Sequence, residues 1–219
     1  MKKQTMIVAV LCSAALFACN TGDNNATGEK PDTSRKELPP VVMPDPGVNT
    51  YASVDISPMD MSYFPADYPK HKTANGARLS PPVARIIYSR PHLSKRKFDS
   101  IIKEGEPWRL GANESSEITF YQPVTIQDKK INTGRYIIYA IPHPDNWTIV
   151  LNSNTDTWGL KQDSTKDLHR FTIPVSKGNP SIEYFTMVFE KTGTGADLII
   201  AWDDRLARLP LSFIYRSQS

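Results

Sequence analysis

The chain has 219 residues, of which 39% are hydrophobic and 22% are charged. This composition is typical of a globular domain, and it excludes a collagen-like, a wholly disordered or a polytopic membrane protein. The formal net charge is only +3, and the densest basic run, Lys95-Arg96-Lys97, is interpreted as a solvated surface turn. The sequence therefore lacks the basic stripe that would grip a nucleic acid, and no such partner is expected.

The first 18 residues predict an export signal. Lys2 and Lys3 precede an apolar run, residues 6–18, that is too short to span a bilayer core about 30 Å thick. The run ends in Leu16-Phe17-Ala18-Cys19, which resembles the lipobox of bacterial lipoproteins. Cysteine is required there because its thiolate is nucleophilic enough to accept a diacylglyceryl group. We therefore expect Cys19 to be the acylated first residue of an outer-membrane lipoprotein of the bacterial cell envelope, facing either the periplasm or the cell surface.

The chain contains two cysteines, Cys12 and Cys19. Cys12 lies in the signal segment, so the mature chain keeps only the acylated Cys19 and forms no internal disulfide. The exported domain must therefore be stabilised by its hydrophobic core, which is feasible for a domain of this size.

Residues 19–77 predict a tether that follows the lipid attachment. The segment is polar and interrupted by prolines, so it cannot bury enough apolar surface to offset the entropy of an ordered chain. Residues 57–65 are an exception, because Met61, Tyr63 and Phe64 help to make them more apolar than a solvated linker needs to be. We expect this patch to dock on the domain that follows.

Residues 78–219 predict a single all-β domain. Short runs rich in Val, Ile, Tyr, Phe and Thr alternate with Gly, Pro, Asn and Asp, which is the pattern of strands separated by turns. The expected strands are residues 83–90, 116–122, 124–127, 135–141, 147–152, 170–175, 183–190, 197–202 and 207–214. The helix candidate, residues 95–103, is too short for parallel crossovers, so we expect antiparallel pairing. This pattern favours an antiparallel β-sandwich of jelly-roll or immunoglobulin-like kind, with a closed β-barrel as the alternative.

Hydrophobic periodicity also predicts where two of these strands lie. Residues 136–141 are Tyr-Ile-Ile-Tyr-Ala-Ile, apolar on both faces, and are therefore expected in the centre of the sheet. Residues 147–152 instead alternate between apolar and polar side chains, which is typical of a strand with one solvated face.

Five short stretches suggest a family. They are Tyr88-Ser89-Arg90-Pro91, Gly105-Glu106-Pro107-Trp108-Arg109-Leu110-Gly111-Ala112-Asn113-Glu114, Gly134-Arg135-Tyr136, Trp147-Thr148-Ile149-Val150-Leu151-Asn152 and Trp158-Gly159. In this order they resemble the domain-of-unknown-function family numbered 2911, and the run from Trp108 to Glu114 is the most specific. The resemblance covers roughly residues 80–213. It implies a lipid-anchored, all-β envelope protein, and it supplies no activity or catalytic residues.

The candidate ligand-binding residues are Arg90, Trp108, Arg109, Asn113 and Glu114. Alternate residues of a strand share a face, so Glu114 would share a face with Trp108 if the strand ran unbroken. A buried carboxylate needs a partner. That partner would then be Arg90, with Asn113 and Arg109 as further hydrogen-bonding groups. If the chain instead turns near Asn113, Glu114 lies at a rim.

This constellation has two interpretations. The one we favour is structural, in which the polar network organises the edge of the sheet. In the other, Arg90 and Arg109 present forked donors to carboxylates or other oxyanions, and Trp108 stacks on a sugar or another ring. Asn113 and Glu114 would then bond hydroxyl groups. The ligand would be a charged glycan or a peptide of the envelope.

Enzymatic functions have less support. Glu104, Glu106, Glu114 and Glu117 could supply a carboxylate pair for a glycan-directed hydrolase, but sequence spacing does not predict the separation that matters. Ser89 and His92 lie close in sequence, but Pro91 separates them and no nucleophile elbow surrounds the serine.

The sequence also lacks a pattern for a metal or cofactor site. The four histidines show no metal-ligand spacing, so neither a metal nor a cofactor is expected.

Trp158-Gly159 lies in a polar loop, residues 152–167, that is long enough to act as a lid. A further alternative is a structural or assembly subunit of an outer-membrane lipoprotein complex, which predicts an exposed apolar patch along residues 59–64.

Overall fold

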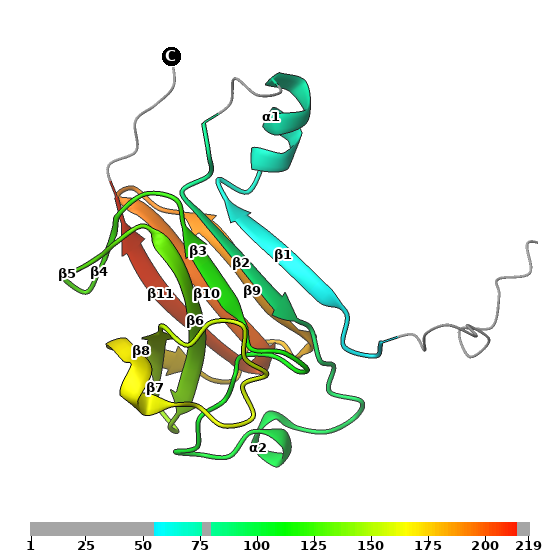
Figure 1. Ribbon diagram of the computed structural model, residues 1–219. Coiled ribbons are helices and arrows are strands. Elements are labelled where there is room, and N and C mark those ends of the chain that lie inside the picture. The colour runs from blue at the N-terminus through cyan, green and yellow to red at the C-terminus, as the bar shows by residue number, and fades with distance from the viewer. Residues whose placement is uncertain (1–54, 76–79, 214–219) are drawn as a thin grey trace, which may run out of the picture. The chain divides into compact units, whose positions relative to one another are not determined.

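The computed structural model describes residues 55–75 and 80–213, and the predicted signal segment and Cys19 lie outside them. Strands dominate the regular structure of the described chain, which confirms the predicted all-β class (Figure 1). The strands are β1 (Met59–Phe64), β2 (Ala84–Ser89), β3 (Glu117–Phe120), β4 (Val124–Ile126), β5 (Lys129–Ile131), β6 (Gly134–Pro142), β7 (Asn146–Asn152), β8 (Asp167–Ser176), β9 (Ile182–Lys191), β10 (Gly195–Asp203) and β11 (Arg205–Ser212). The helices are α1 (Tyr68–Asn75), α2 (Phe98–Ile101) and the 3-10 turn Ser164–Lys166.

The strands form one antiparallel sheet in the order β1-β2-β3-β6-β7-β8-β11-β10-β9, with the short β4 and β5 attached to β11. The two end strands, β1 and β9, lie side by side. Main-chain hydrogen bonds tie the ends of the sheet together just beyond β2, from Leu93 N to Glu183 O at 3.0 Å and from Phe185 N to Pro91 O at 2.9 Å. The sheet is therefore nearly closed into a barrel.

Of the two predicted architectures, this one matches the barrel more closely than the sandwich. The reason lies in β8, whose first part pairs with β7 and whose last residues, Val175 and Ser176, pair with β11. One long strand thus carries hydrogen bonds from one half of the sheet into the other, so the halves are continuous instead of stacked as separate layers. β6 lies between β3 and β7, in the interior position predicted from its apolar faces.

Each of the nine predicted strands is present, and two strands and one helix were not predicted. β1 and α1 fall in the segment assigned to the tether, where β1 pairs with β2 from Met59↔Ser89 to Phe64↔Ala84. Phe64 is only 4% exposed and belongs to the core. The described sheet therefore begins at Met59.

Aromatic side chains fill the α2 end of the barrel. Trp108 packs in the middle of the group, with ring centroids 5.0 to 5.9 Å from those of its four aromatic neighbours. These neighbours are Phe98, Trp147, Phe185 and Trp202. All five side chains are buried, so Trp147 and Trp202 are core residues, as expected for isolated aromatics at strand spacing.

A buried carboxylate holds α2 against this core. Asp203, 2% exposed, accepts hydrogen bonds from Phe98 N at 3.0 Å and from Ser181 Oγ at 2.8 Å, and Lys97 Nζ lies 3.5 Å away. Burial alone would raise the pKa of Asp203, but these donors outweigh it and the pKa is lowered. The carboxylate therefore stays ionised at neutral pH and fixes the start of α2, which borders the site described next.

Candidate functional site

A cavity of about 440 Å³ opens at the α2 end of the barrel. Most of its lining comes from three segments that are distant in sequence: α2 with the residues around it, the stretch from Pro107 to Ala112, and the loop at Gly159 and Leu160. Ser57, Pro91 and Trp202 complete it. Trp108 and Trp202, although buried, border it. Two of the predicted ligand-binding residues, Trp108 and Arg109, therefore line one cavity.

Local backbone geometry places these two side chains on opposite sides of the chain. Trp108 pairs with Ala140 through Trp108 N to Ala140 O at 2.7 Å and Ala140 N to Trp108 O at 2.8 Å, which fixes the indole in the core. The chain then breaks from an extended course, because Leu110 has a φ of +53° although it is bulky and fully buried. Such a conformation is costly for leucine and persists where the surroundings enforce it. Here Ser116 Oγ donates to Leu110 O at 2.5 Å.

The loop that covers the cavity rim rests directly on this stretch. Gly159 has a φ of +74°, and a Cβ at this position would lie 2.1 Å from Ser115 Oγ, so only glycine fits. Arg109 Nη1 donates to Trp158 O at 3.2 Å, and Ser115 N donates to Thr157 O at 3.3 Å. The base of the loop is anchored by Asn152 Nδ2, which donates to Asp163 O at 2.9 Å.

The cavity rim is rich in cations. Arg109 is half-buried, and burial lowers the pKa of its guanidinium. Arg96 donates from Nε to Leu93 O at 2.8 Å and from Nη2 to His92 O at 3.1 Å. Lys103 lies across from the single acidic lining residue, Glu106, with 3.6 Å between Nζ and Oε1. The lining therefore carries three positive side chains against one negative side chain.

The other predicted residues do not meet at this cavity. Arg90 forms an ion pair with Asp60 at 3.2 Å, donates from Nε to Phe185 O at 3.1 Å, and reaches Thr186 Oγ1 at 3.3 Å. It thereby joins the β1–β2 edge of the barrel to β9.

Of the two alternatives for Glu114, the structure shows the turn near Asn113, and the ion pair with Arg90 does not form. Asn113 has a φ of +58°, so the chain turns there and leaves Glu114 exposed at the surface. Asn113 Nδ2 donates to Asp55 Oδ2 at 2.6 Å. Side chains alternate between two faces only along a continuous strand. Because β3 begins at Glu117, this alternation does not extend back to Glu114.

The carboxylates considered for a hydrolase have different partners. Glu104 lies 3.7 Å from His143, Glu106 faces Lys103, and Glu117 lies 3.4 Å from Arg135. Burial raises the pKa of Glu117, an effect that Arg135 partly offsets. Among residues 55–75 and 80–213, no group of three or more His, Cys, Asp or Glu side chains is placed to hold a metal ion.

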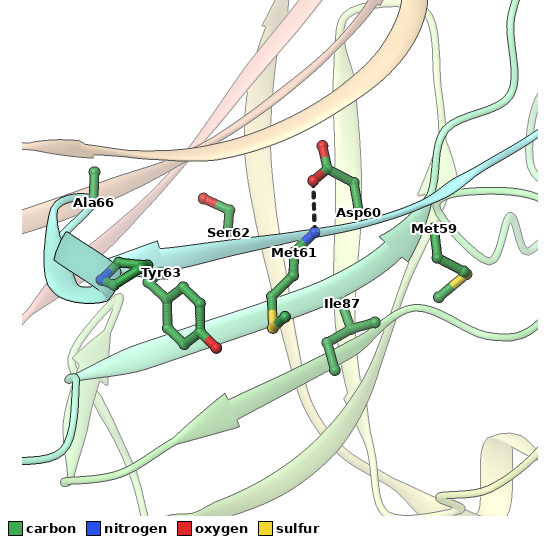
Figure 2. A pocket seen from close by; sticks show the side chains of 8 residues that line it. Met59, Asp60, Met61, Ser62, Tyr63, Ala66 and Ile87 are labelled. Atoms are coloured by element: carbon green, nitrogen blue, oxygen red, sulfur yellow. Dashed lines mark hydrogen bonds between the residues drawn. The ribbon is translucent and has the colours of Figure 1, made fainter. Parts of the chain in front are cut away.

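A second concavity, of about 670 Å³, runs along the outer face of β1. Met59, Met61 and Tyr63 project to this side together with Ile87 of β2, whereas Asp60 and Ser62 project to the other (Figure 2). Met59 is 50% and Met61 45% exposed. This surface, named here the β1 groove, is therefore largely apolar and open.

Sequence patterns missed three residues of the cavity: Arg96, Leu160 and Trp202. Arg96 sits in the basic run interpreted as a surface turn, and only its hydrogen bonds to two main-chain carbonyls direct it to the rim. Leu160, 76% exposed, follows directly after the loop residues Trp158 and Gly159, which the sequence did single out.

Comparisons with known proteins give one match. The family model described as "Protein of unknown function (DUF2911)" matches residues 71–211. No curated protein and no solved structure matches the chain. Within the part of the chain that the structure describes, no helix is long and apolar enough to cross a bilayer.

Proposed function

Because the chain belongs to DUF2911, a family of proteins of unknown function, its activity must be inferred from its own site, and we propose a non-catalytic ligand-binding protein anchored in the bacterial cell envelope. The observation that carries this proposal is the cavity at the α2 end of the barrel, where Trp108 and Arg109 lie on a rigid scaffold. Binding sites are concave and combine apolar surface with a few fixed polar groups, and this cavity presents tryptophan and isoleucine side chains beside hydrogen-bonded arginines.

The arrangement of polar groups supports binding over catalysis. His92 Nδ1 lies 3.1 Å from Ser94 Oγ and 3.6 Å from Glu183 Oε1. Both contacts reach the same ring nitrogen, so this imidazole cannot pass a proton from serine to acid as a Ser-His-acid triad requires. Glycan hydrolysis requires two carboxyl groups facing each other across the substrate. Among the residues that the structure describes, Glu106 is the one carboxylate that lines the cavity.

The binding proposal predicts ligands among envelope components. A panel of soluble peptidoglycan fragments, acidic oligosaccharides and short envelope peptides is expected to contain members that raise the melting temperature of the protein. Ala112→Phe should abolish these shifts, because Ala112 lines the cavity and a larger side chain would fill it. The measurement is a thermal melt of each variant with each compound. Shifts that persist unchanged in Ala112→Phe would place the binding site elsewhere and reject the proposal.

The envelope location rests on Cys19 and predicts a specific loss of membrane attachment. Cys19→Ala should move the protein from the membrane fraction to the soluble fraction, because a multiply acylated cysteine is the expected anchor. Fractionation together with metabolic labelling by a fatty acid tests this, with Cys12→Ala as the matched control that should leave both readouts unchanged. Equal membrane partition of wild type and Cys19→Ala, with no lipid label on either, would contradict it.

An assembly role is the second candidate, and the β1 groove is the observation that favours it. Exposed methionines are flexible and polarizable, and such surfaces adapt to apolar partners. The groove and the cavity have no lining residue in common. Ser57 of the cavity and Met59 of the groove are only neighbours in sequence. The Ala112→Phe variant therefore separates the two roles, since it fills the cavity and leaves the groove unaltered.

A further inference from the structure

We propose that the cavity at the α2 end of the barrel takes an amphiphilic anion, a carboxylate or other oxyanion carried on an apolar or ring-shaped body. This inference rests on the binding function proposed above and names the chemical class of its ligand. It is carried by three features of the lining: cations without acidic partners, an apolar floor, and an indole N–H left available.

The cations are the first feature. Arg96 and Arg109 are hydrogen-bonded to main-chain carbonyls, and no described residue offers either of them a carboxylate. Glu106, the acidic lining residue, faces Lys103. A guanidinium has five N–H donors in a fixed fork, so both arginines keep donors free for a further acceptor. A half-buried arginine without a counter-ion is stabilised by a bound anion, which forms charge-assisted hydrogen bonds with it.

The floor is the second feature, and it determines the body of the ligand. Below the arginines the cavity is lined by Trp108 and Trp202, which are 6% and 1% exposed, with Ile101 and Ile102 on the α2 side. The two indoles lie 5.9 Å apart between centroids at an angle of 20°, so they present nearly parallel rings. An inorganic ion would leave this apolar surface empty. A ring or short hydrocarbon attached to the anionic group would cover it.

The indole N–H of Trp108 is the third feature. The Trp202 indole donates to Glu183 O at 3.1 Å, whereas no group in residues 55–75 or 80–213 accepts from the Trp108 indole. This nitrogen is not among the buried polar atoms that lack a partner, so it is open to solvent and available to an acceptor. Because the Trp108 ring borders the cavity, a ligand acceptor such as a hydroxyl or a second carboxylate oxygen would complete it. The exposed Leu160 at the rim lies where it could pack over the bound body.

A pair of matched probes tests the inference. Anilinonaphthalene sulfonate is an apolar ring system with an anionic group, and phenylnaphthylamine has the same rings without the charge. Both are titrated by fluorescence into the full chain carrying Cys19→Ala, which removes acyl chains that would themselves take up the probes. Arg96→Gln and Arg109→Gln are each expected to weaken sulfonate binding on the order of tenfold while leaving the neutral probe unaffected.

Three controls locate the effect. Arg208→Gln removes the same charge from a distant exposed arginine paired with Glu190, and should change neither titration. Ala112→Phe should weaken both probes, and Met61→Ser, in the β1 groove, should weaken neither. Circular dichroism checks the fold of each variant. Arg96 is exposed, so its substitution alone provides the test if Arg109→Gln does not fold.

The outcomes distinguish failure of the anionic ligand class from failure of the cavity as a binding site. Loss of sulfonate binding confined to the cavity arginines supports the anionic ligand. Equal effects of these substitutions on both probes overturn it, while a loss of both in Ala112→Phe keeps the cavity as a binding site. If Ala112→Phe changes neither probe, the cavity does not bind them and the proposed function itself fails.

Discussion

Replacing Trp108 with alanine is expected to destabilise the protein by about 3–5 kcal/mol, which is a large part of the stability of an ordinary domain. The indole is 6% exposed and contacts four aromatic rings at the α2 end of the barrel. Its removal would leave a void between rings that are held by β7, β9, β10 and α2. These elements cannot all move inward together, so most of the cavity would remain open.

Chemical denaturation of Trp108→Ala and wild type measures this loss. Trp158→Ala is the matched control, because it removes the same side chain from a position that is 55% exposed and should change the stability by about 0.5 kcal/mol or less. A small effect at Trp108, similar to that at Trp158, would mean that the aromatic group is not the packed core described above.

The second large effect is expected at Gly195, where alanine should cost about 3 kcal/mol. Gly195 begins β10 opposite Ser212 of β11. A Cβ at Gly195 would lie only 2.0 Å from Leu211 O and 3.1 Å from the Phe213 ring. The first of these atoms belongs to the backbone and cannot rotate away, so the two strands would have to separate at this end.

Gly193→Ala provides the control in the same turn, because a Cβ there meets nothing within 4 Å. Thermal and denaturant melts of both variants should therefore show a large loss for Gly195→Ala and almost none for Gly193→Ala. Indistinguishable midpoints would show that β10 and β11 accommodate a methyl group without cost, contrary to the contact described.

The sequence predicted the strands well because their signal is local. Runs of β-branched and aromatic residues mark β6 to β11, and the alternation in 170–175 matches the buried and exposed faces of β8. The solvated face predicted for 147–152 is wrong, because residues 149–152 of β7 are all buried. β1 was missed because Met-Asp-Met-Ser has no such run, and its pairing with β2 arises from tertiary contacts. β5 was missed because it is short and follows a turn with positive φ at Gln127 and Asp128, without the usual glycine.

The site was harder to predict because side-chain parity fails wherever the backbone leaves the extended conformation. Trp108 and Arg109 were found from their residue types and do line the cavity. Positive φ at Leu110 and Asn113 then turns the following residues away. A turn near Asn113 was one of the two alternatives from the sequence, but no pattern indicated the positive φ of Leu110. Arg90 was grouped with them because its guanidinium could bind an anion. In the structure it lies at the junction of β1, β2 and β9 and forms an ion pair with Asp60.

The position of β1 has a mechanical consequence. Residues 55–58 lead into β1, and they are held by hydrogen bonds from Asn113 Nδ2 to Asp55 Oδ2 and from Arg90 N to Pro58 O, so a pull along the chain at residue 55 is met by these bonds and then by β1. β1 is held through six register pairs with β2 and by the bridge from Asp60 to Arg90. Peeling it away would uncover the inner face of β2, including Ile86 and Tyr88. Tension at the entry point and opening of the barrel wall are therefore coupled through one six-residue strand.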